Sequence, residues 1–416
     1  MIMKKIILFE MIFILCFGIA FPQTRNQKTK VVTKQNIKKE SDAKLLYEQA
    51  CDLYNGTNGK LMDREKAISL YKQSADMGYS VAQYELGRLY IVSSANKEPV
   101  YTNKEEALDY LKKSAIQKNP NALRLLYYAY YYGMSVPQDY AQAAYWIRIG
   151  VDLEDPACIY SLGLEYQTGK MVEKDYQKAF YLIKKAANLN YVDAYEMVGY
   201  CYLNGWGTEK NINEAKKWYR KGAEKEDSGC QTALADFYAQ IEKDGVQAYY
   251  WYRKAAEKGD AYSQYKVGLC YDCAIGNVEK NTDEAIKWYK KSAEQGYGDA
   301  QFNLAESLKG INPSEAFYWY KKAYENGNLD AGAEIGMMLY GGRGCTENKQ
   351  KSIEILQNLS QKGNARAMAS YGEKLIYGVP GILKKNKSKG IELIREAART
   401  KEPFAEFVAG MHNIKY

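Results

Sequence analysis

Small and bulky apolar residues recur along the chain at a spacing typical of an α-helix, and the whole unit returns about every 36 residues. Ala215, Tyr219 and Ala223 are separated by four residues, so they share one face of a helix. The last position of this small–large–small motif occurs ten times, as Ala75, Ala115, Val151, Ala187, Ala223, Ala256, Ala293, Tyr324, Ser360 and Ala398. A period in this range predicts a protein of stacked repeats.

A second helix is expected upstream of each of these helices. It is centred on a small residue, which is glycine at Gly163, Gly199 and Gly268. A glycine inside a helix costs about 1 kcal/mol relative to alanine, so its recurrence in register indicates close helix–helix contact. Each repeat is therefore predicted to be a hairpin of a first helix (the A helix) and a second helix (the B helix). Such a hairpin buries its apolar face only by stacking on its neighbours.

The residues between and at the end of these helices resemble a known family. Residues 194–207 end in Gly-Trp-Gly, and residues 213–223 read Asn-Glu-Ala-Lys-Lys-Trp-Tyr-Arg-Lys-Gly-Ala. Both segments closely resemble the Sel1-like repeat, as does Gly341–Gly344; tetratricopeptide repeats are relatives with a 34-residue period. The resemblance covers residues 41–403. It implies an all-α fold, an α/α solenoid with a right-handed superhelix of about ten repeats, in which the A helices line a concave surface.

The pattern predicts four parts in the chain. They are a signal peptide at 1–20, a basic flexible linker at 21–40, the repeat solenoid at 41–403 and a C-terminal capping segment at 404–416. The expected repeats are 41–79, 80–119, 120–155, 156–191, 192–227, 228–260, 261–297, 298–328, 329–364 and 365–403. The linker is predicted to be flexible because it is polar and basic and has little apolar surface to bury.

The N-terminus has the order of regions found in a secretory signal peptide. Lys4 and Lys5 precede an apolar run that is interrupted only by Glu10, and Gly18-Ile-Ala20 offers small residues for cleavage. We therefore expect an exported protein, located in the periplasm, at the cell surface or outside the cell. An uncleaved membrane anchor is the alternative, although the run is shorter than the roughly 20 residues that a spanning helix needs.

The charge pattern argues against nucleic-acid binding. The formal net charge is +8, but residues 1–40 hold eight basic and two acidic side chains. The remaining residues therefore hold 50 basic and 48 acidic side chains, and this near-neutral mixture lacks the basic surface of a nucleic-acid-binding protein.

Little in the sequence points to catalysis or to a cofactor. The single histidine, His412, leaves no set of residues for a histidine-based triad or zinc site. The Cys270-x-x-Cys273 pair lacks a second pair for zinc and the βαβ setting of a redox motif, so it is interpreted as a chance pair or a local disulfide. Cys158 and Cys230 replace alanine at a packing position and are expected to be buried. We expect no enzyme, no catalytic or metal-binding residues and no cofactor.

Tyrosine is the most prominent lead to a binding surface, because the chain has 40 of them. Residues 127–132 read Tyr-Tyr-Ala-Tyr-Tyr-Tyr, and Tyr127 and Tyr130 occupy packing positions of the repeat. Tyr128, Tyr131 and Tyr132 are expected to point off the packed face. Rigid aromatic side chains are enriched in interfaces, so these three are candidate binding residues; a composition bias of the repeat is the alternative.

The resemblance implies a protein–protein interaction adaptor or scaffold, in envelope assembly or signalling. The expected partners are other proteins, with no nucleic acid and no integral membrane segment once the signal peptide is removed. A cell-wall or glycan-binding protein, or an enzyme or inhibitor directed at the cell wall, is the alternative function.

Overall fold

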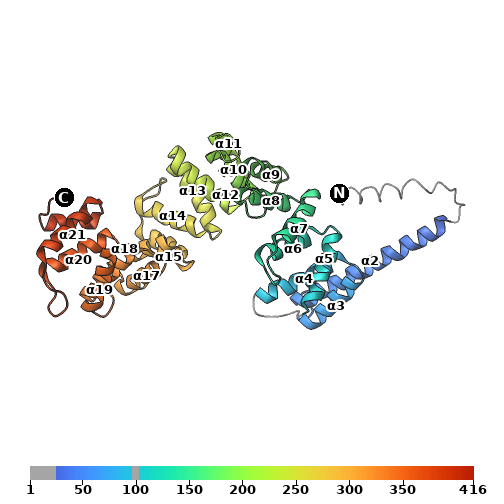
Figure 1. The fold of residues 1–416 in the computed structure, drawn as a ribbon, viewed down its shortest axis with the longest axis horizontal. Coiled ribbons are helices and arrows are strands. Elements are labelled where there is room, and N and C mark those ends of the chain that lie inside the picture. Colours follow the sequence, from blue (N-terminus) through green and yellow to red (C-terminus); the bar gives the residue numbers. More distant parts are fainter. Residues whose placement is uncertain (1–24, 96–102) are drawn as a thin grey trace, which may run out of the picture. The chain divides into compact units, whose positions relative to one another are not determined.

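The computed structural model of the chain describes residues 25–95 and 103–416. Within these ranges the regular structure is helical, apart from a single antiparallel bridge between Val379 and Leu383. The chain divides into two units, residues 1–191 and residues 192–416 (Figure 1). The expected signal peptide at 1–20 lies outside the described residues.

Unit 1 consists of consecutive helix pairs, each packed on the next pair. The pairs are α2 (Arg25–Asn55) with α3 (Arg64–Asp76), α4 (Ser80–Ala95) with α5 (Lys104–Ile116), α6 (Pro120–Tyr132) with α7 (Tyr140–Asp152), and α8 (Pro156–Thr168) with α9 (Tyr176–Asn188). In each pair the first member is the predicted A helix and the second is the B helix.

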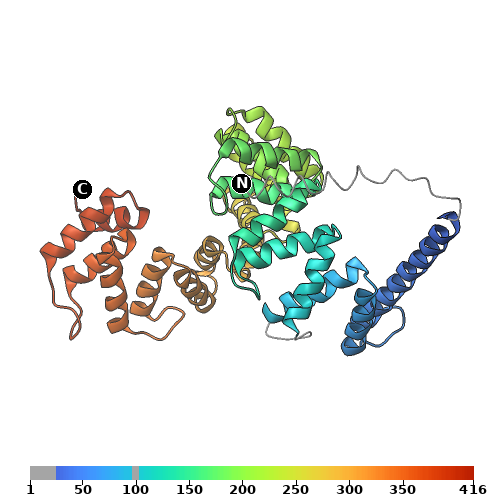
Figure 2. The same ribbon diagram turned by 45° about the vertical axis from the view of Figure 1, so that its right-hand side comes forward.

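Unit 2 continues the same arrangement through six pairs (Figures 1 and 2). They are α10 (Asp193–Asn204) with α11 (Ile212–Glu224), α12 (Ser228–Phe237) with α13 (Gly245–Glu257), α14 (Ala261–Cys273) with α15 (Thr282–Glu294), α16 (Gly298–Leu308) with α17 (Pro313–Glu325), α18 (Leu329–Gly341) with α19 (Lys349–Gln361), and α20 (Ala365–Tyr377) with α21 (Lys387–Arg399). A π-helical turn, Tyr238–Glu242, extends α12. The last helix, α22 (Pro403–Met411), packs against α20 and α21. The predicted fold of stacked helical hairpins is confirmed.

Local sequence signals explain where the helices begin and end. The Asn211 side chain accepts a hydrogen bond from the backbone N–H of Glu214 and so caps the first turn of α11. Asp175 caps α9 in the same way. The A helices α8 and α10 end at Gly169 and Gly205, both with φ of +75°, a conformation that glycine adopts without a Cβ clash. The glycines between the helices are therefore helix caps.

The small central residue of the A helix contacts the bulky residue of its own B helix. A Cβ atom on Gly199 would lie 2.4 Å from Cε1 of Tyr219, which is buried. At Gly268 the same atom would lie 2.5 Å from Cδ1 of Tyr289. The close contact predicted from the mid-helix glycines is confirmed, and it brings the two helices of a hairpin near enough to exclude water.

The cysteines of the described residues are all free thiols. Cys158 and Cys230 are buried at the contact between one hairpin and the next, so the predicted packing role is confirmed. Burial raises the pKa of the Cys201 and Cys270 thiols to about 11, which disfavours their thiolates near neutral pH.

The structure differs from the expected flexible linker, because α2 already begins at Arg25 and residues 25–40 are helical. Residues 36–42 of this segment are exposed, so packing does not explain their helix. Helix propagation costs far less than nucleation, and Lys, Gln and Glu are good helix formers. The packed end of α2, around Ala43 and Ala50, provides the nucleus from which the helix extends. None of the described helices is both long and apolar enough to cross a membrane.

Candidate functional site

The A helices of unit 2 carry a surface of half-buried aromatic rings and charged side chains. We call it the A-helix surface and define it by Tyr262, Tyr265, Tyr297, Phe302, Glu306 and Arg366. The Tyr297 ring lies 6.1 Å from that of Tyr262 and 5.2 Å from that of Tyr265, measured between ring centroids. These contacts join α14 to the start of α16, so the aromatic surface continues from one repeat to the next.

Asp236 anchors one end of this surface. Its Oδ1 atom accepts a hydrogen bond of 2.9 Å from the hydroxyl of Tyr262 and another from the hydroxyl of Tyr252. The three residues belong to α12, α14 and α13, which places one carboxylate between two repeats. The hydrogen bonds hold the phenol of Tyr262 in place, so its ring is presented in a fixed orientation.

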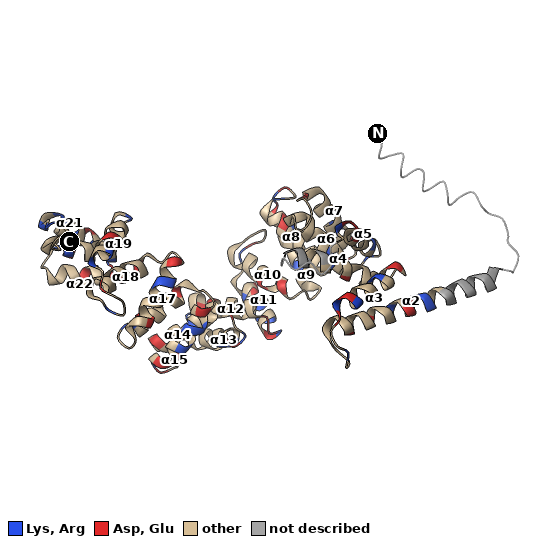
Figure 3. Cartoon of the chain, turned by 90° about the horizontal axis from the view of Figure 1, so that it is seen from below, with Lys and Arg blue, Asp and Glu red and all other residues tan. Residues whose placement is uncertain are grey.

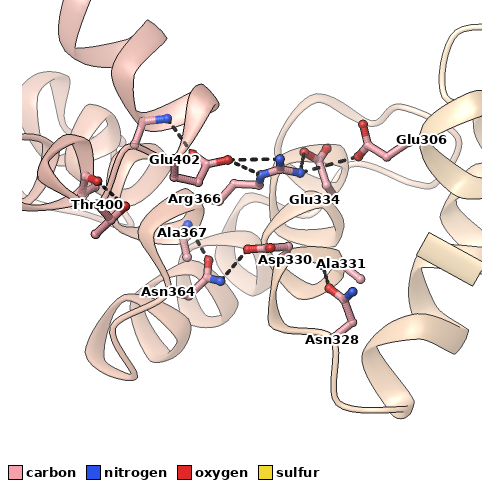
Figure 4. Close-up of polar contacts among 12 residues, drawn as sticks. Glu306, Asn328, Asp330, Ala331, Glu334, Asn364, Arg366, Ala367, Thr400 and Glu402 are labelled. Carbon is pink, nitrogen blue, oxygen red and sulfur yellow. Dashed lines mark hydrogen bonds and ion pairs between the residues drawn. The ribbon is translucent and has the colours of Figure 1, made fainter. Parts of the chain in front are cut away.

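Arg366 forms the centre of a charged cluster at the other end (Figure 4). Its Nη1 atom lies 3.0 Å from Oε1 of Glu334 and 3.6 Å from Oε1 of Glu306, and its Nη2 atom lies 3.1 Å from Oε1 of Glu402. The carboxylates come from α18, from α16 and from the N-cap of α22. One guanidinium therefore connects the last three repeats to the capping helix.

The charges of this cluster largely compensate one another. Glu334 is only 4% exposed on its side chain, and burial raises the pKa of its carboxyl although Lys309 and Arg366 both pair with it. Burial alone would lower the pKa of Arg366, but the surrounding carboxylates raise it. A half-buried guanidinium that pairs with several carboxylates orders the helices around it. The cluster is thus suited to holding the surface around it in a fixed shape.

Arg366 also joins the charged cluster to the aromatic residues. Its Cζ atom lies 5.8 Å from the centroid of the Phe302 ring, within the range of a cation–π contact. Charges of both signs are interspersed along the helices of unit 2 (Figure 3). In the described ranges, no group of three or more metal-ligating side chains is placed to hold an ion.

The predicted tyrosine site lies in unit 1, on α6. Tyr128 and Tyr132 are exposed, at 38% and 63%, and their rings stack with centroids 6.2 Å apart and an angle of 19° between planes. Tyr131 is only 6% exposed, with its ring 5.5 Å from those of both Tyr127 and Tyr140. The expectation that Tyr131 points off the packed face is wrong. Tyr131 follows Tyr127 by four residues and so shares its buried face. The predicted binding patch contracts to Tyr128 and Tyr132.

The A-helix surface has a signal in the sequence, namely aromatic residues at one register of two A helices. Tyr265 and Phe302 each precede the central small residue of their A helix by three positions, at Gly268 and Ala305. Aromatic residues at one register of successive repeats lie on the same side of the stack. The partners of Arg366 had no comparable signal, because the carboxylates occupy different positions in their repeats.

Comparison with known proteins agrees with this architecture. Ten consecutive segments match the family model of the Sel1 repeat: residues 53–79, 80–119, 122–155, 156–191, 192–227, 228–260, 261–297, 298–328, 330–364 and 365–399. No curated protein matches the chain at a significant level.

Solved structures of repeat proteins are similar to this chain. A Sel1 repeat protein from Oxalobacter formigenes has 22% identity and a TM-score of 0.52, over 73% of this chain and 90% of that one. The protein c5321, described as a protective antigen present in uropathogenic Escherichia coli strains and displaying an SLR fold, has 26% identity and a TM-score of 0.44, over 91% and 90% of the two chains. Because the family model matches most of its length, this chain belongs to the Sel1 repeat family.

Proposed function

We propose that this protein is an exported scaffold that binds other proteins through the A-helix surface of unit 2. Sel1 repeats and related helical repeats generally mediate interactions between proteins. The observation that supports the surface is the set of half-buried rings on α14 and at α16, in which Tyr297 contacts Tyr262 and Tyr265 and Phe302 contacts Arg366.

The aromatic rings and the arginine of the A-helix surface are residue types typical of an interaction surface. Aromatic side chains and arginine are the residues most enriched at the centres of interfaces, because they bury a large area at a low cost in conformational entropy. Here hydrogen bonds to Asp236 and ion pairs to Glu334 already hold Tyr262 and Arg366 in place. A surface that is ordered before binding loses less entropy when a partner docks.

The binding proposal is tested by cross-linking the tagged protein in its native host and identifying co-purifying proteins by mass spectrometry. The double variant Tyr265→Ala/Phe302→Ala should lose a specific partner. The matched control is Tyr250→Ala/Tyr318→Ala, which removes two exposed rings from the B helices α13 and α17. If both double variants keep the partner, or if only the control loses it, the A-helix surface is not the binding site.

Export to the envelope, and a role in assembly or signalling there, rest on the N-terminal pattern of residues 1–20. Cell fractionation and N-terminal sequencing of the mature protein test this part separately. We expect a mature N-terminus close to residue 21 in the envelope or the medium. A full-length chain that begins at Met1 and fractionates with the cytoplasm would contradict export, and it would leave the binding proposal intact.

The stacked rings of Tyr128 and Tyr132 favour glycan binding as a second candidate function. Exposed aromatic faces can stack on sugar rings. The double variant Tyr128→Ala/Tyr132→Ala should abolish retention on a cell-wall glycan resin if this role is correct. Unchanged retention of the variant, or no retention of the wild-type protein, would remove the candidate.

A further inference from the structure

A pocket of about 430 Å³ is lined by the B helices of the eighth and ninth repeats, α17 and α19, by the A helix α18 between them in sequence, and by the loop from α18 to α19. Its apolar lining comes from Phe317, Tyr324, Ile335, Leu339 and Ile355. This volume falls in the range of small-molecule sites, which are concave and mostly apolar with a few polar groups. None of these residues belongs to the A-helix surface.

One wall of the pocket exists because the repeat pattern changes here. Tyr324 takes the last position of the small–large–small motif, where most repeats have alanine. The ring fits because it faces a glycine: a Cβ atom on Gly332 would lie 2.7 Å from Cδ2 of Tyr324. The pair places a large aromatic wall in the groove between two hairpins, and the other repeats have no equivalent pair.

The loop that lines another part of the pocket is held in place by a backbone contact. The loop from α18 to α19 passes so close to the start of α17 that a Cβ atom on Gly344 would lie 2.1 Å from the carbonyl oxygen of Pro313. Gly344 also has a φ of +69°, so a larger residue would be both strained and blocked. The next residue, Cys345, lines the pocket and is half-buried. The pocket is therefore bounded on both sides by defined contacts.

Two ammonium groups at the rim have no partner within the described part of the chain. Lys321 of α17 and Lys351 of α19 line the pocket, and neither side chain forms an ion pair, a hydrogen bond or a cation–π contact there. Glu347 also lines the pocket, and its carboxylate lies 3.1 Å from the ammonium of Lys349, which compensates its charge. An apolar hollow with two unpaired cations at its edge is complementary to a molecule with an apolar body and an acidic group.

We propose that this pocket binds an amphiphilic anion of low molecular weight, with its apolar body against Tyr324, Ile335 and Leu339 and its acidic group toward Lys321 and Lys351. The inference does not depend on the proposed scaffold function. It assigns to the eighth and ninth repeats a ligand site that shares no residue with the A-helix surface.

Three probes with one chain length test the proposal by calorimetry on the mature protein: decanoate, 1-decanol and decyltrimethylammonium. Decanoate should bind with one site per chain, at least tenfold more tightly than the cation and more tightly than the alcohol. Equal binding of all three probes would overturn the proposal, because apolar burial alone would then explain it. The absence of saturable decanoate binding would overturn it as well.

Charge reversal locates the site. Lys321→Glu/Lys351→Glu should weaken decanoate binding at least tenfold, and both changes are at exposed positions that should not disturb folding. The control Lys384→Glu/Lys385→Glu makes the same charge change on an exposed loop of the same unit and should bind as the wild type does. Equal affinity of the two double variants would show that the acidic group binds elsewhere.

Cys345 supplies an independent readout. Bound decanoate should slow the reaction of Cys345 with a maleimide, measured by mass spectrometry of the individual peptides. Cys273 is exposed on α14, outside the pocket, and serves as the internal control. Saturating decanoate that leaves the labelling of Cys345 unchanged relative to Cys273 would overturn the assignment.

Discussion

The Sγ atom of Cys230 lies where Gly222 leaves room for it, since a Cβ atom on Gly222 would be only 2.2 Å from that sulfur. Gly222 lies in the last turn of the B helix α11, and Cys230 lies in the first turn of the A helix α12 of the next hairpin. Gly150 and Cys158 repeat the relationship, with a corresponding distance of 2.3 Å. Where the position equivalent to Gly222 is a serine or alanine, the position equivalent to Cys230 is an alanine, as in Ser114 with Ala122, or a serine, as in Ala255 with Ser263. The two positions compensate in size across the contact between hairpins.

This relationship predicts a non-additive pair of substitutions. Gly222→Ala should lower the free energy of unfolding by about 1–3 kcal/mol, because the new methyl group overpacks the contact. Adding Cys230→Ala removes the sulfur and should restore part of that loss. Urea denaturation of both single variants and the double variant measures the coupling. Effects that add within about 0.5 kcal/mol would show that the two side chains do not share this space.

The contact inside a hairpin predicts a larger effect. Gly199→Leu should lower the free energy of unfolding by about 3 kcal/mol or more, because its side chain would occupy the space of the buried Tyr219 ring. The matched control is Gly410→Ala in α22, where a Cβ atom would meet no other atom within 4 Å. That change should be neutral or stabilising by up to about 1 kcal/mol. Thermal unfolding compares the two, and an unchanged melting temperature of Gly199→Leu would exclude the described contact.

The Arg366 cluster predicts a loss of stability that depends on the buried carboxylate of Glu334. Arg366→Ala should destabilise the protein by about 3 kcal/mol, because Glu334 then remains buried with Lys309 as its remaining cationic partner. Glu334→Gln in the same background should recover part of this loss by removing the charge. The control Lys322→Ala breaks an exposed ion pair with Glu325 and should cost less than about 1 kcal/mol. If the double variant is less stable than Arg366→Ala alone, Arg366 is not needed to compensate the charge of Glu334.

Buried tyrosines predict a loss of stability at alkaline pH. Burial, together with a 2.6 Å hydrogen bond to Oε1 of Glu306, raises the pKa of Tyr320 well above its usual value. Above pH 10 the unfolded chain releases this proton while the folded chain keeps it, so unfolding becomes easier as the pH rises. Each such tyrosine lowers the free energy of unfolding by about 1.4 kcal/mol per pH unit in this range.

Urea denaturation between pH 9 and 11.5 measures this dependence. Tyr320→Phe should reduce the slope of stability against pH by the contribution of one group, although it loses the hydrogen bond to Glu306 at every pH. An identical slope in the variant and the wild type would show that Tyr320 does not keep its proton in the folded state.

The periodic features of this fold could be read from the sequence, because they depend on contacts between residues that are close along the chain or equivalent in successive repeats. The spacing of Ala215, Tyr219 and Ala223 predicts a helix face, and Gly199 in register with Gly163 predicts close helices. Both were confirmed, as was the burial of Cys158 and Cys230 in place of alanine. These signals recur in up to ten copies, so one irregular repeat does not hide them.

The individual sites were decided by the tertiary structure, because they depend on side chains that meet across repeats without a regular spacing. Arg366 pairs with Glu306 of α16, Glu334 of α18 and Glu402 at the N-cap of α22, and no period in the sequence relates the four residues. The pocket beside Tyr324 arises from a ring that replaces a small residue and from the glycine that admits it. Whether a tyrosine such as Tyr131 is buried depends on its angle around the helix relative to the neighbouring helices. The repeat pattern therefore determines the fold. The surface chemistry depends on residues that depart from the pattern, and only the tertiary structure decides which of these residues contact one another.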